Sequence, residues 1–321
     1  MSHIIFSALF NNLLETLMSY IPSYINLHTT GELQKRIDAL TDMLRQCRLC
    51  PRHCKVNRLR GELGFCRAGD KLMLSSAFAH FGEEAPLVGS MGSGTIFLTY
   101  CNLRCVFCQN HDISHRGQGE AVTAQQMAAY MVALQQRGCH NINFVTPTHY
   151  VPQIIATLPY AIDHGLRIPL VCNCGGYESL EVIKLLDGII DIYMPDVKWA
   201  ESGVAEKYAQ APDYPAVVKE VLKEMHRQVG DLQISKAGVA ERGLLIRHLV
   251  MPGGLGGTRE LMHYIATEIS PHSYVNIMSQ YRPEYRAGEF PEINRRITHR
   301  EYGEALSYTK AEGLYRGFPE G

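Results

Sequence analysis

From residue 92 onward, short apolar runs alternate with segments of helical periodicity, and this alternation constrains the fold more than any other feature. Buried parallel strands read as nearly continuous apolar runs. Six such runs are expected strands: 95–100, 142–145, 169–173, 189–194, 244–251 and 274–278. The helical patterns between them lie at 123–137, 151–164, 178–187, 215–229 and 258–269. Repeated strand–helix steps with right-handed crossovers predict an α/β fold, a partial (β/α)6 barrel of parallel strands.

The sequence before these runs predicts two further regions. Apolar residues recur at helical spacing between Leu33 and Leu44, so we expect an N-terminal helical leader over residues 1–46. Residues 47–91 begin with a loop rich in Cys, Arg and Gly, and they form the expected cysteine-rich, metal-binding extension of the barrel. Residues 92–321 then form the barrel itself and end in a C-terminal helix.

Composition narrows the classes of function. The formal net charge is -1, so we expect no basic face and no nucleic-acid partner. No apolar run approaches the ~18 residues of a membrane span, and the N-terminus lacks the pattern of a signal peptide, so we expect a cytoplasmic protein without a membrane partner. Clustered thiols in that compartment are expected to be metal ligands, not disulfides.

Three cysteines lie directly after the first expected strand. Cys101, Cys105 and Cys108 have the spacing C-x3-C-x2-C, and polar groups at the carboxyl ends of parallel strands usually form the functional site. Three thiolates bind three irons of a [4Fe–4S] cluster, and no fourth cysteine follows in the loop. The fourth iron is then open, as a catalytic metal requires. Zinc sites more commonly have four ligands in paired C-x2-C spacing, which this triad does not match.

This motif, in which Phe107 precedes the third cysteine, resembles that of the radical S-adenosylmethionine (SAM) superfamily. The resemblance implies a [4Fe–4S] cluster and SAM as cofactors. It also implies reductive cleavage of SAM to methionine and a 5′-deoxyadenosyl radical, which takes hydrogen from a protein or small molecule. Over most of residues 47–315 the chain is similar to an uncharacterised iron–sulfur subgroup related to pyruvate formate-lyase activating enzyme. This implies an activating-enzyme-like oxidoreductase with a flavodoxin or ferredoxin as reducing partner.

The same resemblance implies a set of cofactor contacts. Phe107 is expected near the adenine, and Asn173, which ends the third expected strand, near the ribose or methionyl end. Residues 146–148 read Thr-Pro-Thr where activating enzymes have a Gly-Gly-Glu turn. Backbone carbonyls at Thr146 are therefore expected to meet the methionyl amine. His248, in the fifth expected strand, is also predicted to contact the cofactor.

Two residues after the fourth expected strand are the predicted catalytic pair. Asp196 and Lys198 lie in the sequence Met-Pro-Asp-Val-Lys, which resembles the Asp-x-Lys of activating enzymes that faces the active site. A surface ion pair is the alternative, and such pairs contribute little stability. Their position at the carboxyl end of a strand favours a functional role.

A second group of cysteines precedes the barrel. Cys47, Cys50, Cys54 and Cys66, with the spacing C-x2-C-x3-C-x11-C, are called here the upstream cysteine group. Four thiolates are able to close a zinc site or to bind an auxiliary [4Fe–4S] cluster, and the spacing does not separate the two.

Two other functions remain open. An iron–sulfur electron-transfer protein without SAM chemistry would need a fourth ligand at the triad, such as Cys139 or His111. A zinc-stabilised nucleic-acid module is disfavoured by the near-neutral charge. Cys139, Cys172 and Cys174 stand apart from both cysteine groups and are expected to be buried core thiols.

Overall fold

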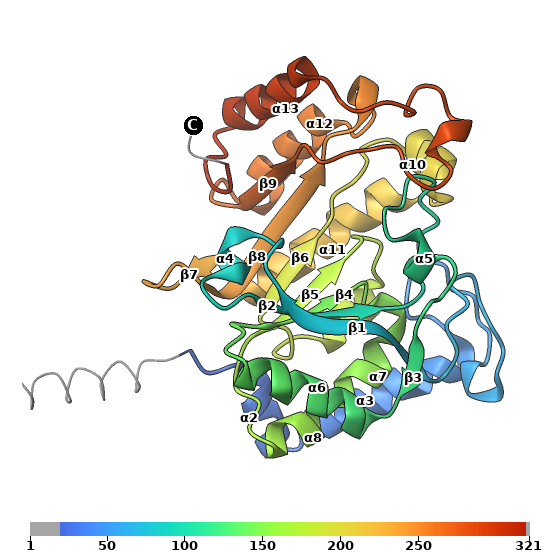
Figure 1. Ribbon diagram of the computed structural model, residues 1–321, viewed down its shortest axis with the longest axis vertical. Helices are drawn as coiled ribbons and strands as arrows, with labels where there is room; N and C mark the ends of the chain where they lie inside the picture. The colour runs from blue at the N-terminus through green and yellow to red at the C-terminus, as the bar shows by residue number, and fades with distance from the viewer. Residues whose placement is uncertain (1–19, 319–321) are drawn as a thin grey trace, which may run out of the picture.

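A nine-stranded, mostly parallel sheet forms the centre of the part of the chain described by the computed structural model, residues 20–318 (Figure 1). Its order is β3-β1-β2-β4-β5-β6-β8-β7, and β9 pairs with β8. The strands are β1 (Leu72–His80), β2 (Ser93–Leu98), β3 (Glu120–Val122), β4 (Ile142–Val145), β5 (Leu170–Cys174), β6 (Ile192–Pro195), β7 (Gln233–Ile234), β8 (Ala240–Leu249) and β9 (Tyr274–Met278).

The six strands expected from the apolar runs are all present, and their neighbours pair in parallel from β2 through β4, β5, β6 and β8 to β9. The α/β prediction is therefore confirmed, as an open sheet. Antiparallel strands β1, β3 and β7 extend it and were not expected. β1 has a half-buried, mixed pattern that does not read as an apolar run. It lies within the segment expected to be a cysteine-rich extension, yet it pairs with β2 in the same sheet.

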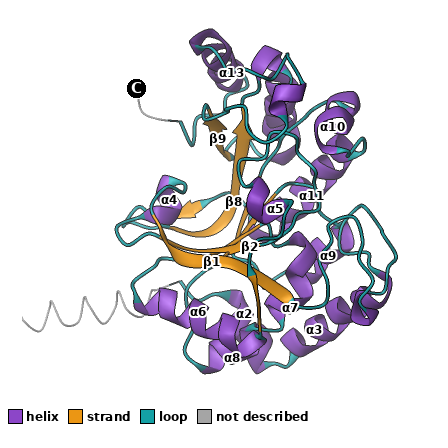
Figure 2. Ribbon diagram, turned by 45° about the vertical axis from the view of Figure 1, so that its right-hand side comes forward, coloured by secondary structure: helices purple, strands orange, loops and turns teal. Residues whose placement is uncertain are grey.

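Helices connect the strands and cover the sheet, and Figure 2 shows α3, α6, α7 and α8 together on one side of it. They are α2 (Ser23–Thr29), α3 (Glu32–Asp42), α4 (Ala85–Val88), α5 (His111–Ser114), α6 (Ala124–Gln136), α7 (Val151–Ile155), α8 (Leu158–Asp163), α9 (Leu180–Leu185), α10 (Ser202–Ala209), α11 (Tyr214–Val229), α12 (Thr258–Tyr264) and α13 (His299–Ala311). Short 3-10 turns lie at Met43–Gln46, Arg58–Arg60, Thr148–Tyr150, Pro252–Gly254 and Ala287–Glu289, and a π-helical turn at Ile265–Ile269.

The two faces of the sheet pack into separate cores because side chains alternate along each strand. Tyr193 belongs to the large core between the sheet and its helices, whereas its neighbours Ile192 and Met194 belong to a small apolar cluster on the other face. Val171, Ala240 and Leu245 are the other strand residues buried in that cluster. Polar side chains of the functional site project from the same face, farther along the strands.

The N-terminal part of the predicted leader, residues 1–19, lies outside the described residues. In the described part of the leader, α3 buries Leu33, Ile37 and Leu40 and so has the expected helical face. No helix within residues 20–318 is both long enough and apolar enough to span a bilayer.

Candidate active site in the barrel

The triad loop leaves β2 and is fixed in place by backbone hydrogen bonds to distant segments. The N–H of Val106 donates to the carbonyl of Tyr208 at 2.9 Å, and its own carbonyl accepts from the N–H of Arg286 at 2.8 Å. The N–H of Tyr100 donates to the carbonyl of Ile113 at 2.9 Å. The loop is therefore fixed by α10, α5 and the segment after β9, and its cysteines do not rely on metal alone for their position.

The three thiols of the triad lie close enough to act on one another electrostatically. Burial raises the pKa of Cys101 to about 12, with a further increase from Cys108, while Lys198 opposes it. Burial also raises the pKa of Cys105, and Cys108 and Cys101 add to the effect while Lys198 again opposes it. Metal ligation needs thiolates. Lys198 is therefore a cation placed to stabilise the deprotonated triad.

Two residues at neighbouring strand ends have left-handed backbone conformations that non-glycine residues rarely adopt. Tyr100, next to Cys101, has φ of 64°, and Thr146, just after β4, has φ of 58°. The N–H of Thr146 donates to the carbonyl of Asn173 at 2.8 Å. Such strain costs about 1–3 kcal/mol and concentrates at functional sites. Thr146, predicted to meet the methionyl amine, is therefore held in an unusual conformation beside Asn173.

A polar network crosses the barrel interior from β4 to β8. Glu83, in the turn after β1, accepts hydrogen bonds from Asn143 at 2.7 Å and from Asn173 at 3.2 Å. Arg247 donates to Asn173 Oδ1 at 2.7 Å and to Asp196 Oδ1 at 2.8 Å. Segments far apart in sequence are thus joined by one chain of hydrogen bonds.

The predicted catalytic pair ends this network. Lys198 Nζ lies 2.6 Å from Asp196 Oδ2, and both side chains are largely shielded from solvent. Burial alone would raise the pKa of Asp196, but attraction to Arg247 and Lys198 outweighs it and leaves the pKa below its usual value. Burial lowers the pKa of Lys198, but Asp196 and Cys105 together raise it above its usual value. The pair is therefore ionised, and Lys198 connects the network to the triad.

The other predicted cofactor residues lie in different surroundings. Phe107 is buried against Trp199 and Tyr281, with ring centroids 6.1 and 5.6 Å away. His248 is fully buried, and its ring nitrogens lie 2.7 Å from the Val197 carbonyl and 2.8 Å from Thr258 Oγ1. Because Arg247 faces the network, the adjacent His248 points to the opposite face, toward α12. Its contact with a cofactor stays a prediction.

The triad and its surroundings have the chemistry that a [4Fe–4S] cluster and SAM need. Three thiols with a nearby cation form a suitable donor set. Asn143 Oδ1 and Trp199 Nε1 are buried and have no hydrogen-bond partner among residues 20–318. Buried polar atoms are normally paired, so an unpaired acceptor on Asn143, a member of the network, suits a bound polar ligand.

Sequence reasoning missed three members of the network. Arg247 had a usable signal, because a charged residue in an apolar strand is expected to face a partner or a site. Asn143 gave a similar but weaker signal in the second expected strand. Glu83 lies in a turn, and only the fold shows that this turn reaches the barrel interior.

The upstream cysteine group is brought together by its loop. All four cysteines line one small enclosed cavity together with Arg58 and His149. Burial raises the pKa of Cys50, and its three partner cysteines raise it further. The four predicted residues therefore line one cavity, which no cysteine of the triad lines, and their binding of a metal stays a prediction.

Backbone N–H groups in this loop are directed at the sulfurs. The N–H of Phe65 donates to Cys54 Sγ at 3.3 Å. Burial raises the pKa of both Cys50 and Cys66, but backbone hydrogen bonds from Arg52 and Ala68 oppose the increase. Hydrogen bonds that favour the charged form of sulfur are what a thiolate–metal site uses.

Among residues 20–318, no three or more His, Cys, Asp or Glu side chains are arranged to hold one metal ion. Ligands of a single ion must converge on one point, whereas the thiolates of an iron–sulfur cluster each bind a different iron and lie farther apart. Cys139, Cys172 and Cys174 are buried, as expected of core thiols. Cys139 precedes β4, at the end of the sheet opposite the triad, so the suggestion that it supplies a fourth triad ligand is wrong.

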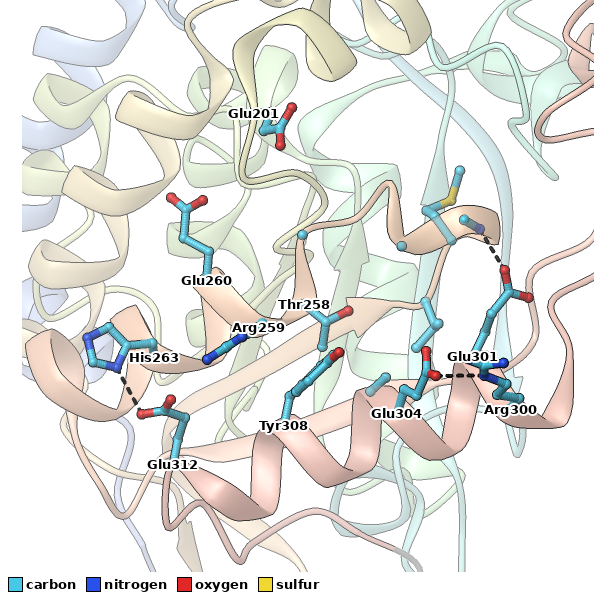
Figure 3. Close-up of a pocket in the computed structure, with 16 residues that line it drawn as sticks. Glu201, Thr258, Arg259, Glu260, His263, Arg300, Glu301, Glu304, Tyr308 and Glu312 are labelled. Carbon is cyan, nitrogen blue, oxygen red and sulfur yellow. Dashed lines mark hydrogen bonds and ion pairs between the residues drawn. The ribbon is translucent and has the colours of Figure 1, made fainter.

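A wide groove of about 1040 Å³ lies elsewhere, between the turn after β8 and helices α12 and α13 (Figure 3). Several carboxylates line it, but Glu301, Glu304 and Glu312 already form ion pairs of 2.7 to 2.9 Å with Arg295, Arg300 and His263, respectively. No cysteine of either group lines this groove. Three of its carboxylates are thus paired, and the lining indicates no particular ligand.

The model of the radical SAM superfamily matches residues 95–235, which include the triad and the predicted catalytic pair. The chain is 33% identical over 291 residues to MJ0674, an uncharacterised protein of Methanocaldococcus jannaschii, covering 88% of this chain and 79% of that protein. A second uncharacterised protein of that organism, MJ0808, is 23% identical over 273 residues, or 79% of this chain and 75% of the relative. Residues 95–235 of the chain form a radical SAM superfamily domain.

The solved structures that match part of this chain are remote in sequence. SuiB of Streptococcus suis, in its crystal structure bound to S-adenosylmethionine, is 14% identical with a TM-score of 0.45, covering 70% of this chain and 48% of SuiB. The radical SAM methyltransferase TsrM of Kitasatospora setae, with cobalamin and a [4Fe–4S] cluster bound, is 13% identical with a TM-score of 0.41, covering 59% and 37% of the two chains. The chain thus spans about half the length of SuiB.

Proposed function

We propose that this radical SAM enzyme holds its [4Fe–4S] cluster on Cys101, Cys105 and Cys108 and binds SAM at the iron that these residues leave open. When bound and reduced, the cluster supplies the electron that cleaves SAM to methionine and a 5′-deoxyadenosyl radical. The observation that carries this proposal is the position of Lys198, which links the triad thiols to the polar network of the barrel.

The residues of this chain have distinct tasks in that reaction. Lys198 stabilises the thiolates, and Asp196 holds Lys198 in place through a 2.6 Å contact. Asn173 and the strained Thr146 lie side by side at two strand ends, where they are placed to bind the ribose or methionyl part of SAM. Phe107 forms an apolar wall for the adenine. His248 fixes the connection between β8 and α12 from the opposite face of the strand, and so positions the strand that lines the cofactor site.

The substrate is a protein or small molecule that gives up a hydrogen atom, as in the activating enzymes of glycyl-radical proteins, which makes the enzyme an activase-like oxidoreductase. A flavodoxin or ferredoxin in the cytoplasm is the reducing partner. The upstream cysteine group binds a second metal centre, because its four thiols line one cavity. An auxiliary [4Fe–4S] cluster fits the spread of the thiols as they stand, whereas zinc would require them to draw closer together.

The test is anaerobic reconstitution with iron and sulfide, followed by dithionite and SAM. We expect 5′-deoxyadenosine and methionine from the cluster-loaded protein. Cys139→Ala, which removes a buried cysteine outside both groups, is the matched control and should keep this activity. A cluster-loaded sample that forms neither product would refute the proposal.

One observation favours a second candidate function, electron transfer without SAM chemistry. His111 lies three residues after Cys108, and its Nδ1 is buried without a hydrogen-bond partner among the described residues. If His111 ligated the fourth iron, the cluster would be closed. His111→Ala would then change the EPR spectrum of the reduced cluster, whereas SAM would not.

A further inference from the structure

Arg58 is a fully buried cation beside the upstream cysteine group. Its side chain has 0% exposure. Within residues 20–318, all its hydrogen bonds go to backbone carbonyls: Nε donates to Gly69 at 3.0 Å, Nη1 to His149 at 2.7 Å, and Nη2 again to Gly69. No carboxylate is among these partners. The guanidinium thus has neutral acceptors but no counter-ion.

A guanidinium remains protonated in proteins, and a buried charge without an opposite charge is strongly unfavourable. The balancing charge must come from the cavity that Arg58 lines. The titratable groups in that lining, besides arginine, are the four cysteines and two histidines, with no Asp or Glu. Neither histidine supplies a negative charge, because an imidazole is either neutral or cationic. Thiolates are therefore the anions available to Arg58.

We propose that the upstream cysteine group binds its metal as an anionic tetrathiolate centre and that Arg58 is the buried counter-charge that stabilises it. This inference rests on the second metal site of the proposed function and adds the group that sets its affinity. Four thiolates on Zn²⁺, or on a [4Fe–4S]²⁺ cluster, give a centre with a net charge of about −2. On loading, each thiol releases its proton to solvent.

Two local features agree with a site built for thiolates. Arg58 lines the same cavity as the four cysteines, so a permanent positive charge lies beside their sulfurs. Gly64 packs so closely on Cys54 that an added Cβ would lie 2.9 Å from its Sγ, which leaves room for no other residue beside that sulfur. The loop thus places both the positive charge of Arg58 and the backbone at Gly64 next to the sulfurs.

The experiment uses the full chain with Cys101, Cys105 and Cys108 replaced by Ala, so that metal found on it belongs to the upstream site. In this background, Arg58→Met removes the buried charge. Arg60→Met is the matched control, because Arg60 is exposed in the same turn. Zinc, iron and sulfide per chain are measured anaerobically, and affinity is measured by chelator competition. Because loss of such a supporting group typically weakens metal binding by about 10–100-fold, we expect that loss for Arg58→Met and no change for Arg60→Met.

Arg58→Lys keeps the charge and tests the proposal if Arg58→Met fails to fold. We expect it to bind metal within about tenfold of the parent, which is about 1.4 kcal/mol. Zinc without sulfide and iron with sulfide both support an anionic tetrathiolate centre, and they identify its metal. Absence of metal from the triad-free chain, unchanged affinity in Arg58→Met, or complete loss of metal in folded Arg58→Lys would overturn the proposal. None of these outcomes depends on SAM cleavage, so failure here is distinct from failure of the radical reaction.

Discussion

The two cysteine groups of this chain each lie beside a buried cation, but the cations are held differently. At the triad, Lys198 is paired with Asp196 at 2.6 Å and belongs to a network that crosses the barrel. At the upstream group, Arg58 has only backbone carbonyls as partners within the described residues. A cation with its own carboxylate leaves the charge of the nearby cluster free to change. A cation without a carboxylate partner depends on the nearby thiolates to balance its charge.

This difference matches the number of thiols. Three thiols leave an iron open for a ligand, and the reaction proposed there changes the charge of the cluster by one electron. Four thiols close the coordination of a metal, which is typical of a structural or relay centre. We therefore expect the two groups to respond independently to substitution.

The largest expected effect is that of Cys105→Ala. This substitution removes one of three cluster ligands, so the triad cluster and all SAM cleavage should be lost, while the upstream metal remains. Iron and sulfide content and 5′-deoxyadenosine formation are the measurements. Retained cleavage in this variant would show that the triad is assigned wrongly.

Cys50→Ala is the reciprocal change. It removes one of four upstream thiols, so the upstream metal should be lost, whereas the EPR signal of the reduced triad cluster should persist. Loss of both signals would mean that the groups are not independent. In that case the contrast between an open and a closed centre would fail.

A smaller effect is expected from Arg247→Met, which breaks the network on the triad side. Arg247 and Asp196 lie 2.8 Å apart with side-chain exposures of 14% and 19%. Breaking a buried pair by removing one partner costs about 3–5 kcal/mol of unfolding free energy. Urea unfolding measures this. Arg300→Met is the control, because the Arg300–Glu304 pair is exposed and such pairs contribute little stability. Equal effects of the two substitutions would contradict the network.

The last expected effect is a change in the pH dependence of stability, at a site that belongs to neither cysteine group. Burial raises the pKa of Asp191 from 3.8 to about 7, against hydrogen bonds from Tyr20 and the Leu170 N–H. The native state therefore holds an extra proton between pH 4 and 7, and stability falls as pH rises through that range. Asp191→Asn should reduce this slope by up to about 1.4 kcal/mol per pH unit, whereas exposed Asp163→Asn should not. An unchanged slope in Asp191→Asn would exclude this residue as the source.

The sequence indicated the parallel strands and both cysteine groups because these signals are local. Apolar runs and cysteine spacings can be read within a few residues. The polar network was not predicted, because Glu83 and Arg247 are far apart in sequence and meet only when the barrel curves. The sequence also did not show which way the side chains of β8 point. Arg247 and His248 are neighbours, and only the strand geometry shows which of them faces the interior. β1 was not predicted because its mixture of buried and half-buried residues resembles a loop.

The most direct test of the account is the EPR spectrum of the dithionite-reduced triad cluster in Cys50→Ala, recorded before and after SAM is added. Removal of the upstream metal leaves one centre to observe. We expect SAM to change the spectrum, because it would bind an iron that has no protein ligand. A spectrum that SAM leaves unchanged would mean that the cluster has no open iron.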